Sequence, residues 1–506
     1  MKSPLLLFIF VFLTGFILAP AIGMAWDEPD NIFSGGVWIN FIKGGFDRSV
    51  FDTSQSEASY FGDLVYPLDR NLAHLPPVHN WVGSAAVLFL EKVGQFLTKD
   101  LIIYSFHLSG AFFFAILVAT VYRFSRHLSL SVSASLFAAS ATFLYPTLFG
   151  FGFSNSKDIA QASLFSVSLY YLVRGRLLGG AIIWGLALAT KFNAIYVPII
   201  WMIWLITKRQ YNKTTIQYML FVIAVGIATA FAVWPYLWYD PINRSLEVIR
   251  YFTNVGLGYI VTWDGIRYPV GSGSAMWWYP WATLAIVTPP LLFPLLVLGF
   301  IKLLRAARPT VFVLVLWILI PMVRTISPFT AYYDGIRHFL EILPALAIVT
   351  GFGVDYLFNL FKKKRLYLYK ASHLYIVITI IYIILINIWY FPYSTGYYNI
   401  FAREANLGFD RDLGGLSIKE AFDYIHKQPG HLRIWVPVAG HLAWYYLKPG
   451  DKYVTTAPEV DYIILINKVS HARKTEFEKE INPVGFTLDH VVRRGEAEFA
   501  WVYGRK

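Results

Sequence analysis

Apolar residues in this chain come in long blocks separated by short polar stretches. A helix needs about 20 consecutive, mostly apolar residues to cross the hydrocarbon core of a bilayer. The pattern therefore predicts an α-helical polytopic membrane protein. Blocks of this kind predict about eleven crossing helices, the fifth and sixth of them short, near residues 4–24, 101–122, 129–149, 157–173, 177–191, 194–207, 216–238, 280–301, 310–327, 338–360 and 373–392.

The basic residues give an independent test, because loops on the cytoplasmic side are enriched in Lys and Arg. If the N-terminus is cytoplasmic, the loops after even-numbered helices face the cytoplasm. All five of these loops are basic: Arg123 and Arg126; Arg174 and Arg176; Lys208, Arg209 and Lys213; Lys302, Arg305 and Arg308; Lys362, Lys363, Lys364 and Arg365. We therefore expect a multi-pass protein of the cell membrane with its other loops on the extracytoplasmic face.

The first apolar block follows Lys2 and resembles a signal peptide, with Ala19 and Ala21 spaced as at a cleavage site. The block exceeds the apolar region of about 7–15 residues that is usual in such peptides. We expect an uncleaved signal anchor, which would place Asp27 just outside the membrane.

Two long segments, 26–100 and 239–279, fall on the predicted outer face. Within the first, residues 37–42 and 81–92 predict interfacial helices. A crossing helix at 78–97 would invert every later loop and put the basic loops outside, so we exclude it. The second segment ends in an aromatic cluster, which indicates a belt at the headgroup level rather than a sugar-stacking platform.

Composition supports a membrane protein, and a change in composition near the C-terminus marks a second domain. The chain is 57% hydrophobic and 15% charged, whereas soluble domains are about one-quarter charged. Residues 1–396 form the predicted transmembrane domain. Residues 397–506 are rich in charge and predict a small extracytoplasmic α/β domain, with a helix at 418–426 and strands at 433–438, 462–466 and 498–503.

The net charge of +12 does not indicate a nucleic-acid partner, because most basic residues flank apolar blocks. The chain contains no Cys, which excludes disulfides, thiolate nucleophiles and Cys-ligated metals.

Acids and cations gather on the predicted outer face, although its loops are otherwise poor in charge. Taken singly, each has an ordinary explanation, since acids cap helices and basic side chains extend to lipid headgroups. Together they form a candidate site. Its members are Asp27, Glu28, His74, Lys157, Asp158, Lys191, Asp334, Arg337 and His338.

Short motifs around these residues resemble the polytopic C-type (GT-C) glycosyltransferases, and more closely the protein O-mannosyltransferase and aminoarabinose-transferase branch. They cover most of residues 1–400 in order and spacing. The motifs are Trp26-Asp27-Glu28, His74-Leu75-Pro76-Pro77, Asn155-Ser156-Lys157-Asp158, Thr190-Lys191-Phe192-Asn193, Asp334-Gly335-Ile336-Arg337-His338-Phe339 and Tyr397-Tyr398-Asn399. The family often reads His-Pro-Pro where Leu75 intervenes here, and His79 also lies nearby.

The resemblance implies the GT-C fold and a sugar donor carried on a polyprenyl phosphate, with inversion in a single displacement. It implies that the first outer acid, Asp27 with Glu28 beside it, serves as base or binds the acceptor. Asp158 matches the second acidic motif, and the His74 motif would help to form the cavity.

Such a transfer needs a base for the acceptor hydroxyl and cations for the departing phosphate. Lys157, Lys191, Arg337 and His338 are the candidate phosphate-binding groups. Arg337 ranks first, because a guanidinium can bind phosphate through two parallel hydrogen bonds.

Several alternatives stay open on the sequence alone. A transporter or flippase for lipid-linked sugars would also suit the short helices and the charge between them. A structural subunit would carry the same acids as solvated loop residues. The acceptor could be a protein, a glycolipid or a glycan. A divalent metal shared by Asp27, Glu28 and Asp158 has no ligand spacing to establish it.

Overall fold

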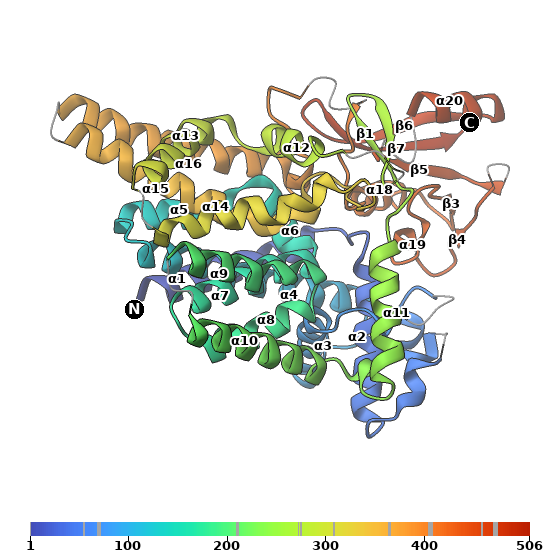
Figure 1. The fold of residues 1–506 in the computed structure, drawn as a ribbon. Coiled ribbons are helices and arrows are strands. Elements are labelled where there is room, and N and C mark those ends of the chain that lie inside the picture. Colours follow the sequence, from blue (N-terminus) through green and yellow to red (C-terminus); the bar gives the residue numbers. More distant parts are fainter. Residues whose placement is uncertain are drawn as a thin grey trace.

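The computed structural model shows a helical protein with a small sheet domain at its C-terminal end (Figure 1). It describes residues 2–53, 56–67, 72–208, 212–271, 273, 276–306, 309–362, 366–402, 408–456, 459–468 and 474–506. The basic loop residues Arg209, Arg308, Lys363, Lys364 and Arg365 lie outside these ranges.

A helix stands at each of the eleven places where the apolar blocks predict one. These helices are α1 (Lys2–Leu18), α4 (Lys99–His127), α5 (Val132–Leu144) with α6 (Pro146–Ser154), α7 (Ser156–Val173), α8 (Leu177–Leu188), α9 (Tyr196–Thr207), α10 (Lys213–Ala232), α12 (Tyr279–Val287) with α13 (Phe293–Ala306), α14 (Pro309–Met322), α15 (Leu343–Lys362) and α16 (Leu366–Tyr390).

Within the described residues, five helices are long and apolar enough to cross a membrane, and the number rises to seven if each bent pair counts as one span. The helices near 177–188, 192–207 and 312–326 are apolar but shorter. The prediction of a polytopic helical membrane protein is confirmed, while only part of the predicted set has full membrane-spanning length.

Two of the predicted spans are broken. The axes of α5 and α6 differ by 60° and those of α12 and α13 by 100°. Proline explains the first break, because Pro146 has no N–H to donate and restricts the residue before it. The breaks lie side by side, since Tyr145 Oη and Thr288 Oγ1 are 2.7 Å apart.

Asparagine side chains satisfy the carbonyl groups that these breaks expose. Asn387 of α16 donates its Nδ2 proton to Leu144 O, 2.6 Å away. Asn399 donates through Nδ2 to Ala285 O and Thr288 O, at 2.7 and 2.8 Å. Its backbone N–H also donates to Ile286 O. Broken helices are tolerated at membrane depth only where such partners replace water.

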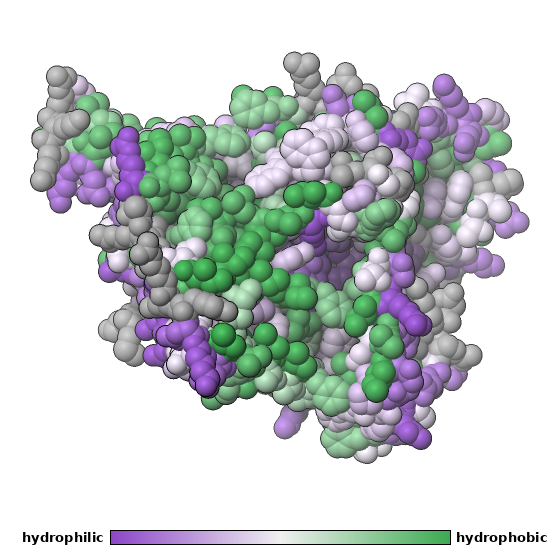
Figure 2. Space-filling view, viewed as in Figure 1, coloured by the Kyte–Doolittle hydropathy of each residue, from purple (hydrophilic) through white to green (hydrophobic). Residues whose placement is uncertain are grey.

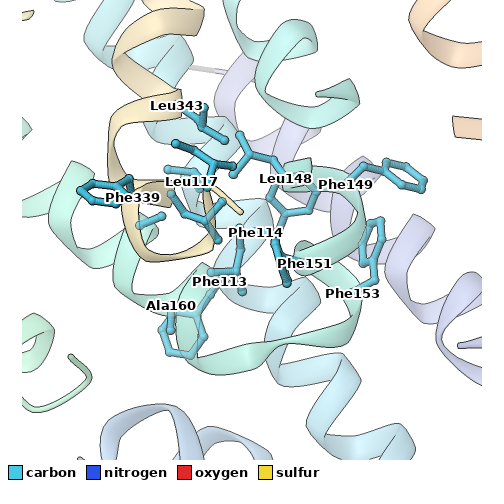
Figure 3. Packing of buried hydrophobic residues seen from close by; sticks show 14 of the residues in the cluster. Phe113, Phe114, Leu117, Leu148, Phe149, Phe151, Phe153, Ala160, Phe339 and Leu343 are labelled. Atoms are coloured by element: carbon cyan, nitrogen blue, oxygen red, sulfur yellow. The ribbon is translucent and has the colours of Figure 1, made fainter. Parts of the chain in front are cut away.

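Aromatic side chains pack the centre of the helical domain between α4, α6, α7 and α15 (Figure 3). Phe114 and Phe153 are fully buried and meet edge to face with their ring centres 5.5 Å apart. Gly152 lies directly on the Phe114 ring, where a Cβ would collide. This packing fixes α7 against the short 3₁₀ helix η9 (Arg337–Ile342), which bears two of the predicted site residues.

The first outer segment has a helix at each of the two predicted places, whereas the second contains a helix and a hairpin that the sequence did not predict. The first forms α2 (Glu28–Lys43) and α3 (Val78–Lys92). Most of α2 is buried against its neighbours rather than lying on the surface, because its residues are apolar on nearly every side. The second segment forms α11 (Pro241–Asn254) and a hairpin of β1 (Ile260–Trp263) and β2 (Ile266–Pro269).

The C-terminal domain is built on a five-stranded mixed sheet in the order β4-β3-β5-β7-β6. Its elements are α18 (Ser417–Ile425), β3 (Arg433–Trp435), α19 (Gly440–Ala443), β4 (Lys452–Tyr453), β5 (Tyr462–Ile466), α20 (Lys474–Ile481), β6 (Phe486–Arg494) and β7 (Ala497–Arg505). Four of these match predicted elements, with β3 shorter than expected. The sequence patterns missed β4, α19, α20 and β6.

Candidate functional site

A cavity of about 1200 Å³ opens between the ends of the helices, α11 and the C-terminal domain. Figure 2 shows the molecule hollowed beside α11, with polar side chains in the hollow and a broad apolar surface next to it. The lining side chains include six Lys or Arg residues (Lys157, Lys191, Arg250, Arg324, Arg337 and Lys468) and four acids (Asp27, Asp30, Glu247 and Asp334). This excess of positive charge favours an anionic ligand.

Asp27 lies in this cavity at the start of α2, with 20% of its side chain exposed. Lys157 Nζ donates to Asp27 Oδ2 at 2.7 Å, and Arg337 Nη2 donates to the same oxygen. Burial raises the pKa of Asp27, but the charges of Arg337 and Lys157 outweigh it and hold that pKa well below the usual value. The carboxyl group is therefore ionised at neutral pH.

Asp158 lies beneath the cavity and is fully buried in the first turn of α7. Asn155 caps that helix, since its Oδ1 accepts from the backbone N–H of Asp158 at 3.0 Å. The two carboxylate oxygens of Asp158 accept from different cations, Oδ1 from Lys191 Nζ at 2.7 Å and Oδ2 from Arg337 Nε at 2.6 Å. A buried carboxylate needs such pairing to remain ionised.

Arg337 joins three carboxylates, because its Nη1 donates to Asp334 Oδ2 at 3.2 Å in addition to its bonds with Asp27 and Asp158. The chain makes a tight turn just before it, with φ of 53° at Asp334 and 67° at Gly335. Left-handed backbone is costly for most residues and least so for Gly, Asn and Asp. The Asp-Gly pair thus allows Asp334 and Arg337 to lie together.

Another arginine, Arg324, forms a separate set of hydrogen bonds with Asn193 and the backbone of His338. Arg324 Nη1 donates to Asn193 Oδ1 at 3.0 Å, and Arg324 Nη2 donates to the backbone oxygen of His338. Asn193 Nδ2 in turn donates to Glu341 Oε1 at 3.1 Å. Arg324 lines the cavity, yet no motif in the sequence pointed to it.

The His74 motif also borders the cavity. The His74 ring meets Tyr251 of α11 with ring centres 4.4 Å apart. His79 lies deeper, with Nε2 3.1 Å from Asn31 Oδ1. Burial and the charge of Lys157 lower the pKa of His79 to about 3, so this ring is neutral.

Glu28 turns away from the cavity despite being next to Asp27. Its side chain is 1% exposed, and its Oε2 accepts from the backbone N–H of Ala25 at 2.7 Å. The same oxygen lies 3.1 Å from His107 Nε2 in α4. The neighbouring acids therefore occupy different surroundings, one in the cavity and one in the protein interior.

Of the eight residues predicted for catalysis or donor binding, six line the cavity, one lies in the ion-pair cluster beneath it and one points elsewhere. The six are Asp27, His74, Lys157, Lys191, Arg337 and His338. In the described part of the chain, no three His, Asp or Glu side chains are grouped as metal ligands. Asp27 and Asp158 each face two cations instead.

Among the described residues of the C-terminal domain, where no motif was found, two line the cavity. Lys468 Nζ donates to Asp334 Oδ1 at 3.0 Å, and His441 Nε2 lies 3.1 Å from Trp26 O. The partners are 134 positions apart in the first contact and 415 in the second, so no local pattern could have revealed either.

Comparison with known proteins gives a match in structure only. No family model matches the chain, and no curated protein matches its sequence. Two crystal structures of ArnT from Cupriavidus metallidurans are similar across 98% of this chain and 97% of ArnT. The apo form has a TM-score of 0.52 at 13% identity, and the form bound to undecaprenyl phosphate has 0.51 at 14%.

The chain has the GT-C fold. Because the match extends over nearly the whole of both chains, the C-terminal domain is included in it. The chain also matches arabinofuranosyltransferase AftD from Mycobacteria, with a TM-score of 0.47 and 12% identity, and it spans 40% of the AftD chain. The fold class predicted from the GT-C motifs is confirmed.

Proposed function

We propose that this protein is a membrane glycosyltransferase that moves a hexosyl or pentosyl group from a polyprenyl-phosphate-linked donor to an acceptor hydroxyl on the extracytoplasmic face. The observation that carries the proposal is an ionised carboxylate, Asp27, held between Lys157 and Arg337 in a large cationic cavity. This arrangement supplies a base and an anion-binding group next to each other. The similar fold of ArnT, solved with undecaprenyl phosphate, supports the class of donor.

The proposed reaction is a single displacement with inversion. The acceptor oxygen attacks the anomeric carbon while the bond from that carbon to the phosphate oxygen breaks. The bonding electrons leave with the phosphate, and Asp27 takes the hydroxyl proton. Within the described residues Asp27 Oδ1 makes no hydrogen bond, so it can accept one from the acceptor.

Lys157 and Arg337 would bind the donor phosphate and stabilise the charge that develops on it. An incoming phosphate adds negative charge close to Asp27 and shares its two cations. Both effects raise the pKa of Asp27, so donor binding would make the carboxylate a stronger base. Lys191, His338 and His74 also line the cavity.

Asp158 would act by holding Arg337 and Lys191 rather than by touching the acceptor. It is fully buried, and both of its oxygens are bonded to cations. The proposal therefore separates Asp27, which reacts, from Asp158, which positions the phosphate-binding groups.

Purified protein in liposomes tests this proposal against the flippase alternative. The donor would be polyprenyl phosphate bearing a radiolabelled hexose or pentose, and the acceptor would be membranes from cells lacking the protein. We expect label to appear on an acceptor together with released polyprenyl phosphate. Movement of the labelled lipid between leaflets without any labelled acceptor would establish a flippase instead.

A further inference from the structure

The C-terminal domain inserts a lysine into the wall of the cavity. Lys468 follows β5 and is only 3% exposed. Its Nζ donates to Asp334 Oδ1 at 3.0 Å and to Leu413 O at 3.3 Å, and it lies 4.4 Å from the centre of the Trp26 ring. Two of these three partners, Asp334 and Trp26, belong to the helical domain.

Burying an ammonium group is costly unless a carboxylate compensates it. The carboxylate here is Asp334, which also accepts from Arg337 Nη1. The backbone at Asn467 is fixed, since its oxygen accepts from the N–H groups of Arg411 and Asp412. Lys468 is thus held rigidly in position and reaches the central arginine through one shared aspartate.

A histidine from the same domain, His441, contacts Trp26 beside the proposed base. His441 Nε2 lies 3.1 Å from Trp26 O, and the two rings meet edge to face with their centres 5.0 Å apart. Burial lowers the pKa of His441, so the ring is neutral and can donate to that carbonyl oxygen. Trp26 is the residue directly before Asp27.

We propose that the C-terminal domain completes the reaction site through two positioning residues, Lys468 acting on Arg337 by way of Asp334 and His441 acting on Asp27 by way of Trp26. This inference rests on the proposed function and adds to it a role for a domain that carries no recognisable motif. The domain would then be needed for transfer itself and not only for folding or for binding a partner.

The charge balance explains why Lys468 matters. With Lys468 present, Asp334 divides its carboxylate between two cations, which leaves Arg337 available to Asp27 and Asp158. Without it, Asp334 keeps only Arg337 as a charged partner among the described residues and draws the guanidinium toward itself. A displacement of about 1 Å in a reacting constellation can reduce a rate about 100-fold.

The test uses the full chain with the single changes Lys468→Met, Lys468→Arg and Asp334→Asn, and with Lys468→Met and Asp334→Asn combined in one double variant. The matched control is Lys419→Met, which removes a lysine of the same domain from an exposed pair with Asp423. Each variant is measured for thermal unfolding, for affinity toward undecaprenyl phosphate and for sugar transfer as a function of pH.

We expect Lys468→Met to unfold close to the wild-type temperature, to transfer sugar about 10- to 100-fold more slowly and to bind undecaprenyl phosphate more weakly. Lys468→Arg should recover most of both properties, because it restores a cation for Asp334. The double variant should be no worse than the poorer single variant, since each change already breaks the pair between Lys468 and Asp334. The acid limb of the pH profile should move upward in Lys468→Met, as Asp27 loses part of its contact with Arg337.

Wild-type transfer and an unchanged pH profile in Lys468→Met would overturn the inference. Equal losses in Lys468→Met and Lys419→Met, or losses that merely follow the amount of folded protein, would assign Lys468 a structural role only. If the wild type transfers no sugar, the proposed function fails, and undecaprenyl phosphate affinity still decides the inference: the same affinity in the wild type and Lys468→Met refutes it.

Discussion

Replacing Asp27 with Asn distinguishes the role of Asp27 in sugar transfer from its role in stabilising the cavity. The substitution keeps the size of the side chain and removes its charge and its ability to take a proton. Loss of a general base lowers a rate by about 100- to 10,000-fold, which corresponds to about 3–5 kcal/mol of activation free energy. We expect sugar transfer by Asp27→Asn to fall within that range.

The structure predicts a much smaller cost in stability. Arg337 keeps its bonds to Asp158 at 2.6 Å and Asp334 at 3.2 Å, so it loses one of three carboxylates. Lys157 loses its partner, but 24% of its side chain is exposed and can be hydrated. A partly exposed ion pair contributes about 1 kcal/mol or less. The free energy of unfolding should therefore change far less than the activation free energy.

Binding of the lipid phosphate should be retained or strengthened, because the carboxylate of Asp27 no longer competes with the phosphate for Lys157 and Arg337. The assay measures transfer of radiolabel from a polyprenyl-phosphate sugar and, separately, the affinity for undecaprenyl phosphate. Glu28→Gln is the matched control, since Glu28 is adjacent in sequence but faces His107 in the interior. It should stay within about tenfold of the wild-type rate, or about 1.4 kcal/mol.

Two results would refute this reasoning. Transfer by Asp27→Asn within about tenfold of the wild-type rate, well short of the loss expected for a general base, would remove Asp27 as the base. A large loss in Glu28→Gln with normal transfer in Asp27→Asn would exchange the roles of the two acids.

Three further predictions concern the cluster and the topology. Arg337→Lys should weaken binding of undecaprenyl phosphate by about 1.5–3 kcal/mol, or about 10- to 150-fold, because a single ammonium cannot replace the three donors of the guanidinium. Titration of the purified protein measures this affinity. In pH–rate profiles the acid limb of kcat/KM should lie below about 3.9, the ordinary Asp pKa. The reason is that the pKa of Asp27 is lowered, so its ionised form persists until the pH falls through that lowered value. The acid limb of kcat should lie higher, since bound donor raises the same pKa, and coincident limbs would contradict this. Because the chain has no Cys, a membrane-impermeant maleimide should label Lys452→Cys on intact cells and Arg176→Cys only after lysis, and the reverse pattern would invert the topology.

The helical architecture was predictable because its signals are local. The thickness of the bilayer sets the length of the apolar blocks, and the positive-inside rule sets where basic residues flank them. Each signal can be identified within about 20 residues. The acids and cations of the GT-C motifs could be assigned to one face from that topology alone. Asp27, Lys157 and Arg337 do lie together, although 310 positions separate the first from the last.

Other parts of the site depend on contacts that no local pattern contains. Lys468 and His441 approach the cavity only after the C-terminal sheet has packed against the helices. Arg324 belongs to no sequence motif, and only the folded chain shows that it lines the cavity and donates to Asn193. Glu28 has the same sequence context as Asp27, yet its contacts with the backbone N–H of Ala25 and with His107 of α4 hold it in the interior.

The asparagine bonds at the helix breaks have a consequence for protein engineering. The composition divides the chain at residues 396 and 397, which would be the natural joint for exchanging C-terminal domains between homologues. Asn399 lies beyond that joint, yet it satisfies three carbonyl groups at the end of α12. A chimaera joined at residue 397 would therefore import a foreign residue at this position.

The position of the joint decides whether Asn399 stays with its α12 partners. A joint after residue 402 keeps Asn399 with the α12 carbonyl groups that it caps, whereas a joint at 397 keeps them together only if the donor domain also begins with a suitable amide. The working unit for recombination is thus the helical domain together with the first few residues that follow α16. Modularity in this chain is set by the hydrogen bonds of a broken helix and not by the change in composition.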